Sequence, residues 1–340
     1  MAGLSLALRF AVLVLAPSVR PAEALQIHPE TSASTCSWLP ASAEDDARSE
    51  HVRSWLDGAS GVRWLRACDK ENRSERYAWK CSRRTGALTT DAYCATLERK
   101  TIKSILFVGD SLSQLHATTT AALLNASFGM WKLGGGNFLK SLRGTGCRGA
   151  VRIGFVRNDI LDTNTQVATQ SEKCFAPHGT TRCEPWATAE LLGSFDVIVV
   201  NSGAHFVEDG RYKKLMSEAA NAISTVARKD SLVIFRSTVP GHQGCNDALA
   251  PFDSISEAEH DTQAQPWYDG DRFAGHNIIA KEIFERAGFV YMDVYTSTIL
   301  RRDMHVGGND CLHYCLPGPS MSWVDILIHG VIGGNNMLHS

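Results

Sequence analysis

This sequence has no large excess of positive or negative charge. Among its 340 residues, 34 Lys and Arg stand against 36 Asp and Glu, which gives a formal net charge of −2. No long basic run is present, so the sequence gives no support for nucleic-acid binding. A neutral or weakly charged substrate fits this charge balance better than a polyanion does.

Long apolar runs are also scarce. The apolar stretch at residues 4–16 is shorter than the roughly 20 residues that a membrane-spanning helix needs. Ala22-Glu23-Ala24 then supplies the pattern of small residues that precedes signal-peptide cleavage. We therefore expect residues 1–24 to be a secretory signal peptide. The alternative is an uncleaved short anchor, the only way in which we expect this chain to contact a membrane.

Motifs for metal ions and phosphates are missing as well. Cys311 and Cys315 have no matching Cys or His pair nearby, and the glycines at 134–136 are not followed by the Lys-Ser/Thr of a phosphate-binding loop. We therefore expect no metal and no cofactor. The ten cysteines all follow residue 24, and an even number in a secreted chain predicts structural disulfides, with the pairing left open.

A strand–turn–helix junction surrounds Ser111. Residues 105–108 are apolar and mostly β-branched or aromatic, which predicts a buried strand, and residues 114–124 read as a helix. A serine on such a turn can stand clear of the sheet, beside the free N–H groups of a helix N-terminus. A nucleophile that must stabilise an oxyanion needs both features. The plainer alternative is that Asp110 and Ser111 only cap the helix.

Two sequence blocks together resemble a known family. GDSL at residues 109–112 resembles the opening block of SGNH/GDSL hydrolases, and DCLHYCLPG at residues 310–318 resembles the Asp-x-x-His-Trp-Cys-x-Pro-Gly block of the PC-esterase, or trichome-birefringence-like, family. The resemblance implies an α/β, SGNH-hydrolase-like three-layer sandwich with a parallel sheet. It also implies an activity related to that of polysaccharide O-acetyltransferases, in the Golgi lumen or outside the cell.

The second block supplies a candidate acid–base pair. Asp310 and His313 are three residues apart, and on one helical turn their side chains would meet on the same face. Asp310 can then hold one ring nitrogen of His313 while the other nitrogen faces Ser111. We therefore expect Ser111, His313 and Asp310 to form a catalytic triad. The alternative is an acid–histidine pair that only satisfies a loop.

Asn201 is the candidate for the rest of the oxyanion hole. It follows residues 195–200, which are apolar on both faces as central parallel strands are. It matches the place where SGNH enzymes carry an oxyanion-hole Asn, so we expect Ser111 and Asn201 to stabilise the oxyanion together. The alternative is a turn-forming role for Asn201.

Three further residues are candidates for substrate binding. The resemblance includes an Arg-x-x-x-Pro-x-His stretch after a later strand, which places Arg236 and His242 in the cleft. The alternative for Arg236 is an ion pair that anchors its loop. His205 follows Asn201 closely and can also face the substrate, or it can be an ordinary loop histidine.

The chain divides into three predicted parts. Residues 1–24 are the leader, and residues 25–99 are rich in Cys and Trp, which predicts a disulfide-stapled N-terminal lobe without a large core of its own. From residue 104 strands alternate with helices, which predicts a parallel sheet in a catalytic domain over residues 100–340. Asn125-Ala126-Ser127 is a sequon that predicts a surface glycan in a secreted chain.

The predicted triad is compatible with more than one function. An acyl-enzyme on Ser111 can pass its acyl group to a sugar hydroxyl or to water. We expect a glycan O-acetyltransferase, whose partners are a carbohydrate substrate and an acetyl donor. A carbohydrate acetyl esterase of the SGNH type and an inactive glycan-binding module are the alternatives.

Overall fold

The computed structural model describes residues 36–58, 77–81, 88–131, 141–163, 183–206, 208–262 and 270–334. Within these ranges a seven-stranded sheet has the strand order β4-β5-β6-β3-β7-β8-β9. The neighbouring strands from β6 to β9 are all parallel, whereas β4 and β5 extend one edge in antiparallel fashion. The predicted α/β class with a mostly parallel sheet is confirmed.

The bounds of the elements are as follows. The strands of the large sheet are β3 (Ser104–Gly109), β4 (Ser127–Trp131), β5 (Ser141–Gly146), β6 (Val151–Arg157), β7 (Val197–Asn201), β8 (Leu232–Arg236) and β9 (Val290–Met292). Two small antiparallel ribbons pair β1 (Cys36–Pro40) with β2 (Tyr77–Cys81) and β10 (His305–Gly307) with β11 (Asp310–Tyr314). The α-helices are α1 (Ala43–Gly58), α2 (Thr90–Arg99), α3 (Ser111–Leu123), α4 (Ala189–Leu192), α5 (Asp209–Val226), α6 (Ile255–Thr262), α7 (Gly270–Arg286), α8 (Tyr295–Thr298) and α9 (Ser320–Asp325), the last continuing as a π-helix over Ile326–Ile332.

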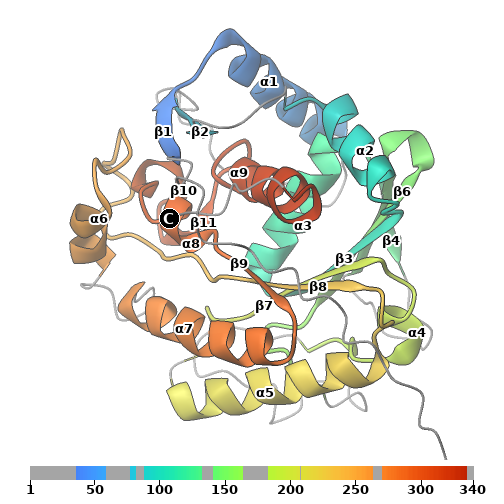
Figure 1. The fold of residues 1–340 in the computed structure, drawn as a ribbon. Coiled ribbons are helices and arrows are strands. Elements are labelled where there is room, and N and C mark those ends of the chain that lie inside the picture. Colours follow the sequence, from blue (N-terminus) through green and yellow to red (C-terminus); the bar gives the residue numbers. More distant parts are fainter. Residues whose placement is uncertain are drawn as a thin grey trace, which may run out of the picture. The chain divides into compact units, whose positions relative to one another are not determined.

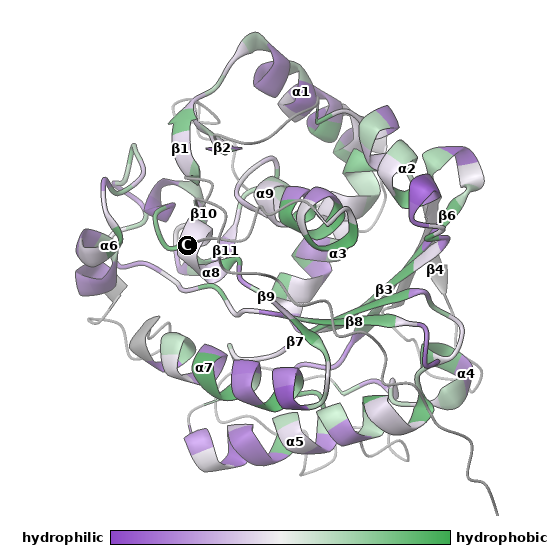
Figure 2. Ribbon diagram, in the orientation of Figure 1, coloured by the Kyte–Doolittle hydropathy of each residue, from purple (hydrophilic) through white to green (hydrophobic). Residues whose placement is uncertain are grey.

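Helices cover both faces of the sheet because its strands are apolar on both faces. In β3, Ile105 and Phe107 join the core beneath α3 and α9, whereas Leu106 and Val108 join the core above α5 and α7. Figure 1 shows α3 and α9 on one side of the sheet and α5 and α7 on the other, and Figure 2 shows how apolar the intervening strands are. The predicted three-layer sandwich is confirmed.

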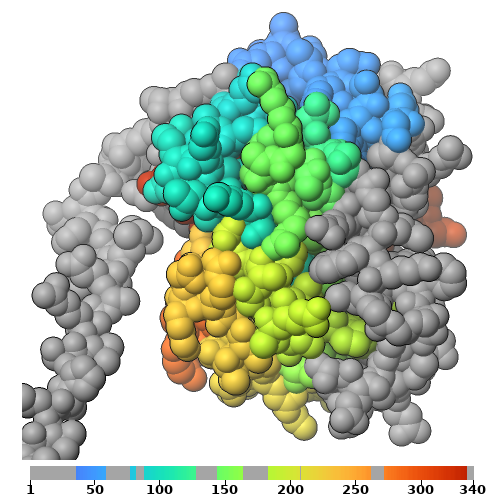
Figure 3. Space-filling view, turned by 90° about the vertical axis from the view of Figure 1, so that its right-hand side faces the viewer, coloured from blue at the N-terminus to red at the C-terminus, as the bar shows by residue number. Residues whose placement is uncertain are grey.

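The described part of the predicted N-terminal lobe shares the core beneath α3. Val52 and Leu56 of α1, and Tyr93 and Leu97 of α2, are buried members of that core. Disulfides Cys36–Cys81 and Cys94–Cys147 staple this region, and Figure 3 shows α2 directly beside the segment around residue 147. The prediction of structural disulfides is confirmed, since no described cysteine is free.

Part of the glycine-rich segment before β6 forms a strand. The sequence predicts a flexible stretch from Gly134 to Gly149, yet Gly144 and Gly146 lie in β5. A Cβ on Gly146 would come within 2.7 Å of the Leu124 side chain, so glycine is needed there for close packing. The glycines at 134–136, Cys174 and the leader lie outside the described residues.

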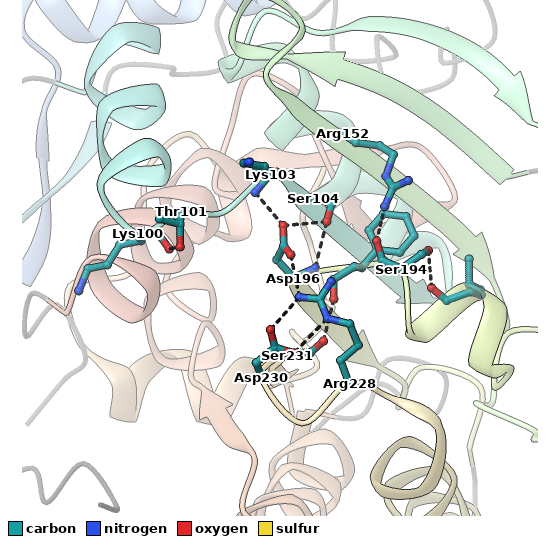
Figure 4. Close-up of polar contacts among 12 residues, drawn as sticks. Lys100, Thr101, Lys103, Ser104, Arg152, Ser194, Asp196, Arg228, Asp230 and Ser231 are labelled. Carbon is teal, nitrogen blue, oxygen red and sulfur yellow. Dashed lines mark hydrogen bonds and ion pairs between the residues drawn. The ribbon is translucent and has the colours of Figure 1, made fainter. Parts of the chain in front are cut away.

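Asp196 holds the starting ends of three neighbouring strands together. Its carboxylate accepts hydrogen bonds from the Lys103 backbone N–H (2.8 Å), the Ser104 hydroxyl (2.9 Å) and the Arg228 guanidinium (2.9 Å), as Figure 4 shows. Burial raises the pKa of Asp196, but these hydrogen bonds outweigh it and hold the pKa below its usual value. The strands therefore start in a fixed register, which also fixes the positions of their carboxyl ends.

None of the described helices is long and apolar enough to cross a membrane.

Candidate active site

Ser111 lies on the tight turn that leads from β3 into α3. A Cβ on Gly109 would lie 2.2 Å from the Asn201 carbonyl oxygen and 2.4 Å from the Ser113 hydroxyl, and its φ is +152°, so only glycine fits this turn. Asp110 caps the helix by accepting from the backbone N–H groups of Leu112 (2.9 Å) and Ser113 (3.3 Å). Capping falls to Asp110, which leaves the Ser111 hydroxyl available for other contacts.

The structure brings Ser111, His313 and Asp310 into one hydrogen-bonded line. His313 Nε2 lies 2.6 Å from Ser111 Oγ, and His313 Nδ1 lies 2.8 Å from Asp310 Oδ2. The arrangement fits a neutral imidazole that donates from Nδ1 to the carboxylate and accepts the Ser111 proton at Nε2. Ser111 is largely buried, at 8% exposed, whereas the His313 side chain is partly exposed, at 21%.

The local structure of the Asp310 segment differs from the expected helical turn. Asp310 and His313 lie on β11, where residues three apart would ordinarily face opposite sides. Asp310 Oδ1 accepts from the backbone N–H of His313 (2.9 Å) and of Leu312 (3.2 Å), and this side-chain turn brings the two residues together. Burial raises the pKa of Asp310, but the hydrogen bonds and charge of His313 outweigh it and lower the pKa to about 2.

A loop from the sheet holds this segment in place. The Cys245–Cys311 disulfide joins the loop after β8 to the residue that follows Asp310. The backbone N–H of His242 donates to the Cys311 carbonyl (3.1 Å), and the Tyr314 hydroxyl donates to the Pro240 carbonyl (2.7 Å). The position of Asp310 and His313 therefore depends on the loop between Arg236 and Cys245.

Asn201 is close to the turn but is not placed to donate to an oxyanion. It is fully buried, and its amide donates to the Arg236 carbonyl (2.8 Å) and the Thr238 hydroxyl (2.9 Å). Both N–H bonds are used, and its Oδ1 accepts from the Arg236 guanidinium (2.5 Å). The structure therefore gives Asn201 a bracing role in place of the predicted oxyanion contact. Ser111, as the first residue of α3, keeps one of the N–H groups that a helix leaves without an intrahelical partner.

Arg236 and His242 do not line a cleft as predicted. Arg236 is fully buried, its guanidinium donates to Asn201 and to the Ser237 carbonyl (2.7 Å), and no described carboxylate forms an ion pair with it. Burial lowers its pKa to about 10, against the opposing charge of Asp110. Arg236 therefore braces the protein interior and is not exposed for the predicted substrate contact. The loop-anchoring ion pair is not seen among the described residues either.

His242 is buried in a pair of histidines. Its Nε2 lies 2.7 Å from the Ile299 carbonyl, and its Nδ1 lies 2.6 Å from His305 Nε2. Burial lowers the pKa of His242 to about 4 and that of His305 well below the ordinary histidine value. The pair supports the loop from inside, and the buried His242 has no exposed surface for the predicted substrate contact.

The carboxyl end of β6 carries polar residues that are not among the predicted site residues. Arg157 pairs through Nε with the buried Asp159, and the His205 Nε2 lies 3.9 Å from Asp159 Oδ2. Of the three predicted substrate-binding residues, only His205 keeps an exposed fraction, at 16% of its side chain. These residues could have been predicted from the rule that ligands bind beyond the carboxyl ends of parallel strands.

No described cluster of three or more His, Cys, Asp or Glu is able to hold a metal ion.

Comparison with known proteins finds a family match in the C-terminal part of the chain. Residues 209–330 match the family model PC-Esterase, the GDSL/SGNH-like acyl-esterase family found in Pmr5 and Cas1p. The predicted resemblance to this family is confirmed. The matched span contains Asp310 and His313, whereas Ser111 precedes it. No curated protein sequence matches the chain.

Several solved structures are similar to this chain at low sequence identity. A carbohydrate acetylesterase from Sinorhizobium meliloti is 10% identical, with 66% of this chain and 98% of that chain covered and a TM-score of 0.35. An acetyl-xylooligosaccharide esterase from Geobacillus is 10% identical, with 70% and 97% covered and a TM-score of 0.31. The aryl esterase of M. smegmatis is 12% identical, with 68% and 99% covered and a TM-score of 0.31.

Proposed function

We propose that this protein is an O-acyltransferase that moves acetyl groups onto a glycan through an acyl-enzyme on Ser111. The observation that carries the proposal is the line of contacts from Ser111 Oγ to His313 Nε2 (2.6 Å) and from His313 Nδ1 to Asp310 (2.8 Å). The match of residues 209–330 to an acyl-esterase family supports the same chemistry.

In the first half of the reaction, His313 Nε2 takes the Ser111 proton while Oγ attacks the acetyl carbonyl of the donor. The negative charge that develops on the carbonyl oxygen is stabilised at the N-terminus of α3, where the Ser111 backbone N–H has no intrahelical partner. The tetrahedral intermediate then collapses, the bond to the donor oxygen breaks, and that oxygen leaves with the proton from His313. Asp310 stabilises the imidazolium between these two steps.

In the second half, His313 takes a proton from a sugar hydroxyl, whose oxygen attacks the acetyl group on Ser111. The Ser111–acetyl bond breaks, and Oγ recovers its proton from His313. Water in place of the sugar would yield acetate. The esterase reaction is therefore the second candidate, and the description of the family as acyl-esterases favours it. A positioned acceptor and exclusion of water would favour transfer.

The cysteines support a place in the secretory pathway for this activity. The described disulfides Cys36–Cys81, Cys94–Cys147 and Cys245–Cys311 require an oxidising compartment. The Golgi lumen and the extracellular space both meet this condition, and both contain glycans. The proposed partners are a carbohydrate acceptor and an acetyl donor.

Two measurements test the proposal. A serine-directed fluorophosphonate probe labels folded wild-type protein at Ser111 if the serine is activated, and no labelling would favour a glycan-binding module without turnover. Incubation with an acetylated donor and a panel of neutral oligosaccharides, followed by mass spectrometry, then separates the two reactions. Acetylated oligosaccharide supports transfer, and acetate as the only product supports the esterase.

A further inference from the structure

The carboxyl end of β6 is bonded directly to the turn that carries Ser111. Arg157 pairs in register with Gly109 on the neighbouring strand β3. The backbone N–H of Asn158 donates to the Gly109 carbonyl at 2.9 Å, two residues before Ser111. The carboxyl end of β6 therefore lies next to the turn of the proposed nucleophile, at the edge of the sheet where ligands bind in such folds.

Arg157 uses only part of its hydrogen-bonding capacity. Its Nε pairs with the carboxylate of Asp159, which is fully buried. A guanidinium carries five N–H donors in a planar fork, and both Nη groups of Arg157 make no hydrogen bond to a described residue. The side chain retains 15% of its surface exposed. The ion pair thus fixes the orientation of Arg157 and leaves a pair of donors for a ligand.

His205 adds a third donor from the neighbouring loop. It follows β7, and its Nε2 lies 3.9 Å from the other oxygen of the Asp159 carboxylate. The Ser202 hydroxyl donates to the Asp159 carbonyl at 2.8 Å, which ties the loop of His205 to the segment of Arg157. Asp159 therefore contacts two partly exposed side chains, one at the end of β6 and one on the loop after β7.

The charges of this cluster favour a neutral ligand. The carboxylate of Asp159 offsets the charge of Arg157, so the cluster offers hydrogen-bond donors with little net positive charge. A ligand carboxylate gains most from a cation that has no counter-charge. Two neighbouring hydroxyl oxygens on a sugar ring can accept from both Nη groups and need no such charge.

We propose that Arg157 and His205, oriented by Asp159, bind vicinal hydroxyl groups of a neutral sugar ring next to Ser111. The inference rests on the proposed function, because it identifies the residues that hold the glycan for acetyl transfer. It assigns Arg157 and His205 to substrate binding and makes Asp159 a positioning residue.

Equilibrium binding tests the proposal independently of turnover. Calorimetric titrations use the full chain with Ser111→Ala, and the probes are a xylo-oligosaccharide, a gluco-oligosaccharide and an oligogalacturonate. We expect at least one neutral probe to bind more tightly than the oligogalacturonate. Arg157→Gln should weaken that binding by about ten- to a hundredfold, the effect of losing hydrogen bonds from a charged donor.

Matched variants separate recognition from folding. Arg157→Lys keeps the charge but loses the fork, so it should bind as weakly as Arg157→Gln. Lys214→Gln, an exposed change on α5, should leave the dissociation constant unchanged. Circular dichroism of each variant checks that it is folded. His205→Gln is a second test, because it removes a hydrogen-bond donor that comes from a different loop.

Three outcomes would overturn the inference: an unchanged dissociation constant in folded Arg157→Gln and His205→Gln, tighter binding of the oligogalacturonate than of any neutral probe, or no binding of any probe. Failure of the proposed function has a different signature. In that case wild-type protein shows no fluorophosphonate labelling, while the effect of Arg157→Gln on sugar binding is still measurable.

Discussion

Ser111 and His313 are 202 residues apart in the chain, yet His313 Nε2 lies 2.6 Å from Ser111 Oγ. The serine is placed by the turn after β3, and the histidine by a ribbon that a disulfide connects to the loop after β8. Contact between them therefore depends on the whole sheet having folded correctly.

Replacement of Ser111 by alanine should abolish acyl transfer while the fold persists. Removal of a triad nucleophile lowers kcat on the order of 10⁶-fold, and the small side chain makes no capping contact that Asp110 does not already supply. The measurement is hydrolysis of p-nitrophenyl acetate together with thermal melting. Ser217→Ala, a change on α5 away from the site, is the control. More than a few per cent of activity in folded Ser111→Ala would rule out the assignment.

Replacement of Asp310 by asparagine should lower kcat by about 10⁴-fold, because an amide that donates to Nδ1 stabilises the wrong tautomer of His313.

The contribution of Asp310 to the unfolding free energy should also depend on pH. The pKa of Asp310 is lowered to about 2 in the folded protein, below the ordinary value of about 3.9. Its contribution is therefore complete above that ordinary value and is lost as the pH falls toward 2.

Urea unfolding of wild type and Asp310→Asn at pH 6 and at about pH 2.5 measures this contribution. The advantage of wild type should shrink at the lower pH. An advantage of equal size at both pH values would show that the ionised carboxylate contributes no stability.

Replacement of Asn201 by alanine should affect stability more than chemistry. The change removes the acceptor of a buried guanidinium and two donated hydrogen bonds, which costs about 2–4 kcal/mol of unfolding free energy. Loss of an oxyanion donor would instead lower kcat by about 10²–10³-fold. We expect the folded Asn201→Ala protein to lose less kcat than this. Asn221→Ala on α5 is the exposed control. Full stability combined with a hundredfold loss of kcat would restore the oxyanion role.

Removal of the Cys245–Cys311 disulfide should reduce activity more than removal of Cys36–Cys81. The first bridge joins the loop after β8 to the residue next to Asp310, whereas the second closes the ribbon β1–β2. Closing 66 residues of chain contributes about 4 kcal/mol in the chain-entropy account. Paired Cys→Ser variants, compared by kcat at a temperature where both remain folded, test the difference. Equal kcat values would remove the link between this bridge and the site.

The architecture was predictable because its signals are local. The apolar residues of β3 and β7 and the glycine at position 109 each report on their own segment, and the order of the two blocks suggested which side chains meet. Asp310 and His313 do come together with Ser111 in the structure, although a side-chain turn on a strand achieves this in place of a helical turn.

Orientation of buried polar side chains was not predictable from the sequence. The amide of Asn201 is turned toward Arg236 and Thr238, which lie more than thirty residues later in the chain. Likewise, the burial of His242 depends on His305 and Ile299 from other elements. Tertiary contacts decide such cases, so a polar residue after a strand indicates the edge of the sheet but not which way it faces.

Asp196 lies where the strands start, at the opposite edge of the sheet from the turn of Ser111. Its bonds to Lys103, Ser104 and Arg228 determine how firmly the strands are assembled, and they involve none of the proposed catalytic residues. Selection, or an engineer, can therefore adjust the lifetime of the folded protein at this edge while turnover at the opposite edge is left alone.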